Sequence, residues 1–285
     1  MIEPSRPVLR WHGGKWLLAP WIITHLPPHR IYVEPFGGAA SVLLRKPRSQ
    51  GEVWNDLDGD LVNLFRVLRS PEAPALIEAL RLTPFARDEF TGAYLASDVP
   101  VERARRMIVR SFMGFGSNSV HRLSGFRSNG IRAGTLPQHN WASYPDALAT
   151  IVERFAGVVV ESRDAIELMA QQDRRDALFY VDPPYVFDTR GDGAADYAHE
   201  LDDAGHAALL GALRGLAGMV VLSGYPHVLY EALLPDWRRV ERTALADGAR
   251  ERTEVLWINP AAAAALDAHA GGARMPLFSA AEAFA

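Results

Sequence analysis

Short apolar runs alternate with segments of helical periodicity over most of this chain. Five of these runs lie at 31–36, 52–56, 155–161, 177–181 and 219–223. Strands that alternate with helices form a mostly parallel sheet with helices on its faces. Two later runs, over 237–245 and 254–259, follow each other closely and predict an antiparallel pair. The sequence therefore predicts an α/β fold whose sheet is closed by antiparallel strands.

The alternation stops between residues 71 and 150. This stretch begins with helical segments punctuated by prolines and continues as loops rich in glycine, serine and asparagine. It falls between the second and third predicted strands, as an inserted subdomain would. We therefore predict a sheet domain formed by 1–70 and 151–260, a mainly helical insert over 71–150, and a C-terminal tail over 261–285.

The composition is that of an ordinary globular protein, with 48% hydrophobic and 22% charged residues. Cysteine is absent, which excludes disulfides and thiolate metal sites. No apolar run reaches the length of a membrane helix, and the N-terminal segment lacks the apolar core of a signal peptide. We therefore expect a cytoplasmic protein that does not engage a membrane.

Positive charge is concentrated in the predicted insert, although the whole chain carries a net charge of −4. Between residues 101 and 145 the only acidic residue is Glu102, so the local charge is +6. The arginines of this window are Arg103, Arg105, Arg106, Arg110, Arg122, Arg127 and Arg132. Like charge gathered in this way favours the binding of a polyanion.

Three predicted strands end in residues that suit a ligand, and open α/β sheets bind ligands at the carboxyl ends of their strands. Gly37 and Gly38 follow the first strand and let the backbone approach a ligand closely. Asp56 ends the second strand, where a carboxylate binds ribose hydroxyls, and Asp164 follows the third. The sequence has neither the glycine pattern of dinucleotide binders nor the Gly-Lys-Ser/Thr of a phosphate loop. These features fit a nucleoside without a pyrophosphate, such as S-adenosylmethionine, or else a tight turn and helix caps.

The apolar run over 177–181 ends in Asp182, two prolines and Tyr185. Proline has no N–H for a strand ladder and fixes φ, and the residue before a proline is held extended. The strand therefore cannot continue. Residues 182–185 either form a simple turn or display their side chains at the tip of a buried strand.

Several segments of the chain resemble one family. RWHGGKWLLAPWI near the N-terminus, then VEPFGGAASV, then DPPY resemble the Dam-like N6-adenine DNA methyltransferases in sequence and order. SFMGFGS, DTR, DYAHEL and LSGYPHVLY agree with the branch that is common in phages and prophages. The resemblance covers roughly residues 9–260 and implies a Rossmann-like methyltransferase sheet with an inserted DNA-recognition subdomain.

The resemblance assigns a cofactor site and a catalytic site. S-adenosylmethionine is expected to bind against Trp11, Lys15, Phe36, Gly38, Asp56, Asp164 and Asp182. An ionised Asp182 and the Pro183 carbonyl would accept hydrogen bonds from the two N–H groups of adenine N6, which favours a pyramidal nitrogen. Tyr185 is expected to stack on the base, which must first be flipped out of the duplex. This chemistry requires no metal and no covalent nucleophile.

The expected substrate is double-stranded DNA, read by the insert. Arg122, Arg127 and Arg132 lie on predicted loops and are the candidates for DNA contact, whereas the arginines of the preceding helix could simply be solvated. Ala40 stands where many relatives have glycine, and its methyl group is expected to narrow the approach to the cofactor. Tyr197 and His199 are expected to help close the loop after DPPY.

Other functions are compatible with parts of the sequence. They are methylation of RNA, methylation of cytosine N4, and a decayed relative that only binds DNA. The tail adds a possible partner, because Arg274, Met275, Leu277 and Phe278 resemble the short peptides that dock on the replication sliding clamp, with arginine in place of glutamine. The alternative is that these apolar residues fold back on the core of the protein.

Overall fold

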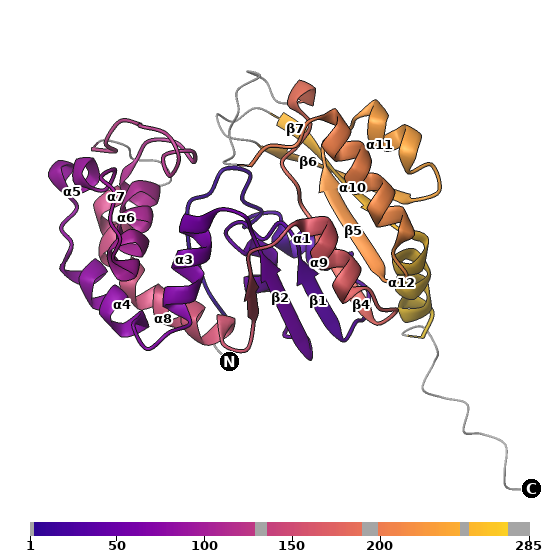
Figure 1. Ribbon diagram of the computed structural model, residues 1–285, viewed down its shortest axis with the longest axis horizontal. Helices are drawn as coiled ribbons and strands as arrows, with labels where there is room; N and C mark the ends of the chain where they lie inside the picture. The colour runs from indigo at the N-terminus through magenta and orange to yellow at the C-terminus, as the bar shows by residue number, and fades with distance from the viewer. Residues whose placement is uncertain (1–2, 129–135, 190–198, 246–250, 273–285) are drawn as a thin grey trace, which may run out of the picture.

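A seven-stranded sheet in the order β3-β2-β1-β4-β5-β7-β6 forms the core of this computed structural model (Figure 1). The structure describes residues 3–128, 136–189, 199–245 and 251–272. The strands are β1 Ile31–Glu34, β2 Gly51–Asn55, β3 Val159–Glu161, β4 Ala177–Val181, β5 Met219–Gly224, β6 Arg238–Leu245 and β7 Glu251–Ile258. The first five are parallel, whereas β7 runs antiparallel to both β5 and β6. The predicted α/β sheet with a closing antiparallel pair is confirmed.

The helices lie on both faces of the sheet and beside its β3 edge (Figure 1). Near the sheet they are α1 Ala19–Ile23, α2 Ser41–Arg45, α3 Gly59–Leu68, α9 Ala165–Gln172, α10 Asp203–Gly215, α11 Val228–Leu233 and α12 Pro260–Gly272. Between β2 and β3 lie α4 Ala73–Leu82, α5 Arg87–Gly92, α6 Pro100–Met113, α7 Pro137–Ala142 and α8 Tyr144–Phe155. A single 3-10 turn, Phe187–Thr189, follows β4.

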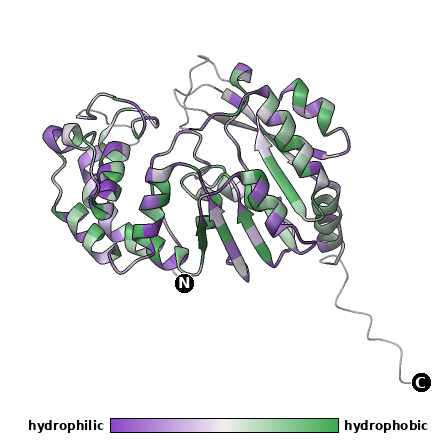
Figure 2. Ribbon diagram, viewed as in Figure 1, coloured by the Kyte–Doolittle hydropathy of each residue, from purple (hydrophilic) through white to green (hydrophobic). Residues whose placement is uncertain are grey.

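Alternate residues of each central strand enter two different cores, as the two-residue period of a strand requires. Leu178 and Tyr180 of β4 pack in the core that holds α1, α2 and α12. Phe179 and Val181 pack in the core that holds α9, α10 and α11. Every residue of β4 is buried, which explains its unbroken apolar sequence. In Figure 2 most of β5 is likewise coloured as hydrophobic, whereas the helices around the sheet carry both hydrophobic and hydrophilic residues.

The strand order fixes where a ligand can bind. The chain runs outward from β1 to β2 and β3, then returns to pair β4 with the other side of β1. The direction of winding therefore reverses between β1 and β4. In open α/β sheets a crevice forms at the carboxyl ends of the strands at such a switch point.

The strand predicted over 155–161 is shorter than expected. Residues 144–155 form α8, with Pro145 in its first turn, and only Val159–Glu161 are extended. Gly157 separates the two with φ 88°, a left-handed value that glycine accepts readily. Helix α8 runs through residue 150 without a break, so the boundary of the insert at that position stays a proposal.

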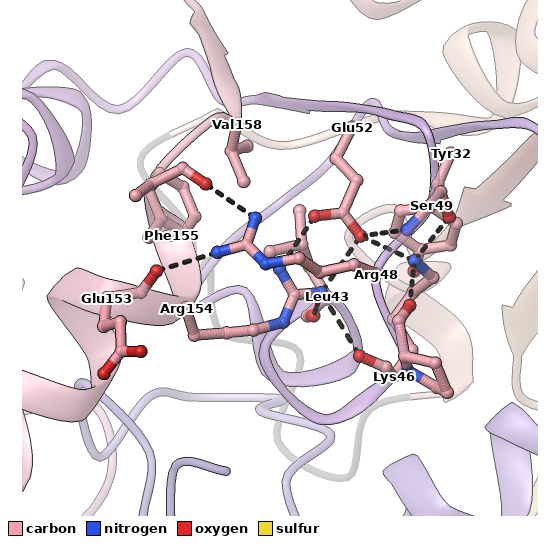
Figure 3. Close-up of polar contacts among 12 residues, drawn as sticks. Tyr32, Leu43, Lys46, Arg48, Ser49, Glu52, Glu153, Arg154, Phe155 and Val158 are labelled. Atoms are coloured by element: carbon pink, nitrogen blue, oxygen red, sulfur yellow. Dashed lines mark hydrogen bonds and ion pairs between the residues drawn. The ribbon is translucent and has the colours of Figure 1, made fainter. Parts of the chain in front are cut away.

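Buried charges fasten α8 to the sheet (Figure 3). Glu52 of β2 accepts hydrogen bonds from Arg154 of α8, from Nη1 to Oε2 at 2.7 Å and from Nη2 to Oε1 at 3.0 Å. Lys46 Nζ lies 2.7 Å from the same Oε1. Arg154 also donates to the carbonyl of Leu43, just before the end of α2. The last element before β3 is therefore anchored by a network in which all three charged side chains are buried.

Candidate active site

A cavity of about 490 Å³ opens at the switch point, at the carboxyl ends of β1, β2 and β4. The residues that the resemblance assigned to the cofactor all line it, namely Trp11, Lys15, Phe36, Gly38, Asp56, Asp164 and Asp182. They come from five separate parts of the sequence, and the fold of the parallel sheet brings them together. The cavity is large enough for a ligand of nucleoside size.

The loop after β1 forms one wall of the cavity. Gly38 has φ 47°, and its N–H donates to Asp56 Oδ2 at 2.9 Å. A Cβ atom on Gly38 would lie 3.1 Å from the Trp11 indole nitrogen, so the glycine permits close packing of these two segments. The second Asp56 oxygen accepts from the Asp58 N–H at 2.9 Å. Burial raises the pKa of Asp56, and these backbone hydrogen bonds oppose the rise.

Ala40 has a different role from the one predicted. It is not among the residues that line the cavity, although its neighbours Ala39 and Ser41 are. Ala40 has φ 54° and ψ 33°, the left-handed conformation, directly before α2. Glycine is favoured in this conformation because it has no Cβ. Its methyl group therefore strains the backbone and does not face the cavity directly, and the expected weakening of cofactor binding stays a prediction.

Asp182 lies at the tip of β4 and faces the cavity. Lys15 Nζ is 3.1 Å from its Oδ2 and also donates to the Gly13 carbonyl at 2.7 Å. Asp182 Oδ1 is buried and has no hydrogen-bond partner among the described residues. Burial raises the pKa of Asp182, while the Lys15 ammonium acts in the opposite direction. The site thus holds one carboxylate oxygen that is fixed in place and still able to accept.

Tyr185 lies behind Asp182, outside the set of residues that line the cavity. Its hydroxyl donates to Glu254 Oε2 at 2.8 Å and lies 3.0 Å from Ser223 Oγ. The Lys15 ammonium lies 4.7 Å from the centre of its ring, a cation–π distance. The side chain is only 7% exposed, so in this conformation it supports the DPPY segment. Its stacking on a base remains a prediction.

Asp164 has two functions in the structure. Its Oδ1 accepts from the N–H groups of Ile166 and Glu167 at 2.9 and 3.0 Å, which caps α9. It lines the cavity as well, so the capping and the cofactor interpretations of this residue are compatible. Asn55 holds the adjoining loops together, because its side-chain amide donates to the Pro35 carbonyl at 2.8 Å and to the Arg163 carbonyl at 3.0 Å.

Several residues that line the cavity were not predicted from the sequence, and they include Glu34 and His121, whose side chains are titratable. Glu34, the last residue of β1, has one buried oxygen without a hydrogen-bond partner among the described residues. His121, from the segment between α6 and α7, lies edge-on to Trp11 with ring centres 5.2 Å apart and 3.3 Å from Asp58 Oδ2. Burial lowers the pKa of His121, and the Asp58 carboxylate opposes this. Glu34 was detectable as an acid at a strand end, but no local pattern points to His121.

The arginines of the insert fall into two groups. Those on α6 are paired with acids, since Arg103 and Arg110 lie 2.6 and 3.4 Å from Asp60. Arg105 binds Glu89 and Glu102, and Arg106 also binds Glu102. Arg122 and Arg127 lie on the loop between α6 and α7, away from the cavity lining, and Arg132 lies outside the described residues. Two acids from outside the window, Asp60 and Glu89, thus pair with these arginines and reduce the local charge from +6 to +4.

The remaining sequence-predicted residues lie around the cavity or outside the described ranges. Pro183 and His199 line the cavity, whereas Tyr197 and the tail residues Arg274, Met275, Leu277 and Phe278 are outside the residues that the structure describes. In the described part of the chain, no group of three or more His, Asp or Glu side chains could hold a metal ion. Within the same residues, no helix is long and apolar enough to cross a membrane.

Comparison with known proteins agrees with this geometry. The chain matches the D12 class N6 adenine-specific DNA methyltransferase family over residues 11–216. DNA adenine methylases of Vibrio cholerae and Escherichia coli are 36% and 37% identical to it over 80 and 68 residues. These alignments cover 28% and 24% of this chain, and the same shares of the two relatives. A precorrin 8w decarboxylase of Methanobacterium thermoautotrophicum aligns over 85% of this chain and 89% of its own, but a TM-score of 0.34 at 10% identity carries no argument.

Proposed function

This chain belongs to the D12 class N6 adenine-specific DNA methyltransferase family, and we propose that it transfers a methyl group from S-adenosylmethionine to N6 of an adenine flipped out of duplex DNA. The observation that supports this most directly is Asp182 Oδ1. It is a buried carboxylate oxygen without a partner among the described residues, at the tip of β4 and in the same cavity as Gly38 and Asp56. An acceptor held in this way suits a substrate that brings its own N–H.

The residues of the cavity fit the proposed cofactor. Asp56 is held by the N–H groups of Gly38 and Asp58, at a position suited to ribose hydroxyls. Trp11 and Phe36 contribute apolar surface to the wall of the cavity, and Asp182 and Lys15 contribute its paired charges. When bound, the cofactor would supply an electrophilic methyl group on a sulfonium.

The protein side of the reaction is positioning and electrostatics. Asp182 Oδ1 would accept from one N–H of adenine N6, and the carbonyl of Pro183, which also lines the cavity, would accept from the other. Lys15 holds the other Asp182 oxygen and opposes protonation of the carboxylate, so the acceptor is in place before the base arrives. Such preorganisation stabilises the transition state without reorganisation during the reaction.

The decisive experiment measures transfer of tritium from methyl-labelled S-adenosylmethionine to duplex DNA, duplex RNA or no nucleic acid. We expect label in DNA alone, recovered as N6-methyladenine after hydrolysis. Asp182→Ala should abolish transfer while its circular dichroism and melting remain close to those of the wild type. Label in RNA, or as N4-methylcytosine, would overturn the assignment. Near-normal turnover by Asp182→Ala would overturn the mechanism.

We propose a cytoplasmic location and a weak docking of the tail on the sliding clamp. The location follows from the DNA substrate in a bacterial or phage-infected cell. The docking is supported by the sequence Arg274-Met275-Pro276-Leu277-Phe278 after two glycines. A peptide of residues 270–285 should bind the host clamp with a Kd of about 1 μM, near −8 kcal/mol. Replacing Leu277 and Phe278 by alanine should remove that binding, and no binding by the native peptide would exclude the contact.

A further inference from the structure

We propose that Glu34 holds a proton in the free protein and releases it to solvent when the cationic cofactor enters the cavity. Cofactor binding would then be linked to pH through a residue of β1 as well as through the DPPY segment. This inference rests on the proposed function only in taking S-adenosylmethionine as the ligand. Its geometry comes from the cavity itself.

The two oxygens of Glu34 have different surroundings. Oε1 accepts hydrogen bonds from the Tyr32 hydroxyl at 2.7 Å and from the Leu43 N–H at 2.8 Å. Oε2 is buried, and no described residue donates to it or accepts from it. The residue is 2% exposed, and it lines the cavity. A proton on Oε2 would therefore need no change in the protein, since Oε1 already has both of its donors.

The groups around Glu34 leave its charge poorly compensated. They are Tyr32 on its own strand, Lys46 after α2, Tyr180 on β4 and Asp182 directly after β4. Burial raises the pKa of Glu34 to about 8, with the Asp182 carboxylate adding to the rise and the hydrogen bonds and Lys46 opposing it. Lys46 is bound to Glu52. At pH 7 Glu34 is therefore mostly the neutral acid.

Glu34 Oε2 and Asp182 Oδ1, from neighbouring strand ends, are thus both buried carboxyl oxygens of cavity-lining residues without a hydrogen-bond partner among the described residues. The Lys15 ammonium pairs with Asp182. A ligand with a sulfonium and an ammonium group brings the positive charge that Glu34 lacks. An opposite charge nearby favours the ionised form of a carboxyl, so Glu34 loses its proton as the ligand binds. A neutral nucleoside of the same shape has no such effect.

Calorimetric titration of the full chain in two buffers tests the inference. S-adenosylmethionine is titrated at pH 7 in phosphate and in Tris, whose ionisation enthalpies differ widely, and the difference in heat gives the number of protons released. Glu34→Gln keeps the acceptor for Tyr32 and Leu43 and mimics the neutral acid. We expect the wild type to release about one proton more than Glu34→Gln, and this difference to disappear near pH 9.5, where Glu34 is already ionised.

Two controls test this result, one with a different variant and one with a different ligand. Glu167→Gln removes an acid that is well exposed on α9, and it should release as many protons as the wild type. Methylthioadenosine, a neutral analogue, should bind the wild type without releasing protons. Equal release by wild type and Glu34→Gln, while both bind the cofactor, would overturn the inference and leave the proposed function intact. A wild-type chain that binds no cofactor would overturn both.

Stability of the free protein gives an independent measurement. A carboxyl whose pKa is higher in the folded than in the unfolded protein contributes to stability at low pH. This contribution is complete when the pH is below the pKa of the unfolded state, and it is lost as the pH rises through the pKa of the folded state. The wild type should therefore lose stability between about pH 5 and pH 9 relative to Glu34→Gln. Parallel stability curves for the two proteins across this range would show that Glu34 is ionised in the free protein and would overturn the inference.

Discussion

The hydroxyl of Tyr185 donates a hydrogen bond to Glu254 Oε2 over 2.8 Å, and this contact joins the DPPY segment to the antiparallel strand β7. Both side chains are buried. Burial raises the pKa of the tyrosine well above its usual value and also raises that of the glutamate, while Lys15 lowers the latter. The tyrosine therefore stays a donor. Strand β7 is thus part of the support of the site as well as of the antiparallel pair that closes the sheet.

Replacing Tyr185 by phenylalanine tests this support. The change keeps the ring over Lys15 but removes the hydroxyl, so the buried Glu254 carboxyl loses its donor. Leaving such a group unsatisfied should lower the free energy of unfolding by about 1–3 kcal/mol, as measured by urea denaturation. Glu254→Gln keeps an acceptor for the hydroxyl and should cost less.

The double variant separates the contact from general damage. If the hydrogen bond couples the two residues, the costs of Tyr185→Phe and of Glu254→Leu, which removes the acceptor, will not add, and the double variant will be more stable than their sum predicts. Strict additivity would show that the two side chains contribute independently, and the support assigned to the contact would be withdrawn.

Lys15 controls the protonation of Asp182 in our proposal. Burial raises the pKa of Asp182, and the ammonium 3.1 Å away holds it down. Lys15→Met should therefore raise this pKa further and move the rising limb of the pH–rate profile to higher pH. Activity should fall more at pH 6 than at pH 9, with saturating cofactor at each pH. Arg163→Met, at another part of the cavity wall, should leave the midpoint unchanged. If Lys15→Met lowers the rate by the same factor at every pH and leaves the midpoint of the profile unchanged, this role would be contradicted.

The sequence was sufficient to predict most of the sheet, because apolar runs bounded by breakers mark buried strands directly. The family motifs were sufficient to predict seven residues that line the cavity as well, because most of them lie in short segments at strand ends. The strand β3 was predicted too long because the apolar residues at the end of α8 run into it, and only the conformation of Gly157 separates them.

Contacts between distant segments could not be predicted. Glu254 meets Tyr185 across 69 positions of the sequence, and Asp60 meets Arg103 across 43. A charge count over residues 101–145 includes the arginine and omits its partner, so it exaggerates the basic character of the insert. His121 was missed for the same reason, because only the packing of the insert against α3 brings it to the cavity.

Ala40→Gly should stabilise the protein. Ala40 has φ 54°, and a left-handed alanine costs about 1–2 kcal/mol, part of which is offset because glycine gains more freedom in the unfolded chain. We expect a net gain of roughly 0.5–1 kcal/mol in thermal or urea unfolding. Ala39→Gly, at the preceding position without positive φ, should destabilise by a similar amount. A loss of stability in Ala40→Gly would show that its buried methyl group matters more than the strain.

Arg154→Met should destabilise the protein strongly, because it removes a partner of the buried Glu52 carboxylate (Figure 3). Breaking a buried pair on one side costs about 3–5 kcal/mol. Burial alone would raise the pKa of Glu52, but the hydrogen bonds from Arg154 and Lys46 outweigh it and the pKa lies below the usual value. The stabilisation should therefore be present above about pH 5 and lost as the pH falls further.

Arg81→Met serves as the matched control for this network. Arg81 pairs with Glu78 and Asp146 on the surface, where solvent screens the charges, so its removal should leave the unfolding curve almost unchanged. Equal effects of the two substitutions, or a difference that persists at pH 3, would contradict the assignment of the stability to the buried pair.

The arginines of the insert should separate into two functional groups in DNA binding. Arg106 on α6 is bound to Glu102 and to the carbonyls of Leu95 and Ala96, so Arg106→Gln should affect folding stability and leave DNA affinity nearly unchanged.

Arg122, on the loop after α6, should contact the DNA. If it binds a phosphate, Arg122→Ala lowers affinity for all sequences and reduces the salt slope by about one. If Arg122 reads a base, Arg122→Ala loses about 1–3 kcal/mol of binding free energy that depends on the base at one position of the recognition site. The two variants should be compared by fluorescence anisotropy over a series of salt concentrations. Equal losses of affinity would show that the paired arginines of α6 reach the DNA, and that the charge of the whole window, rather than of its loop, attracts the polyanion.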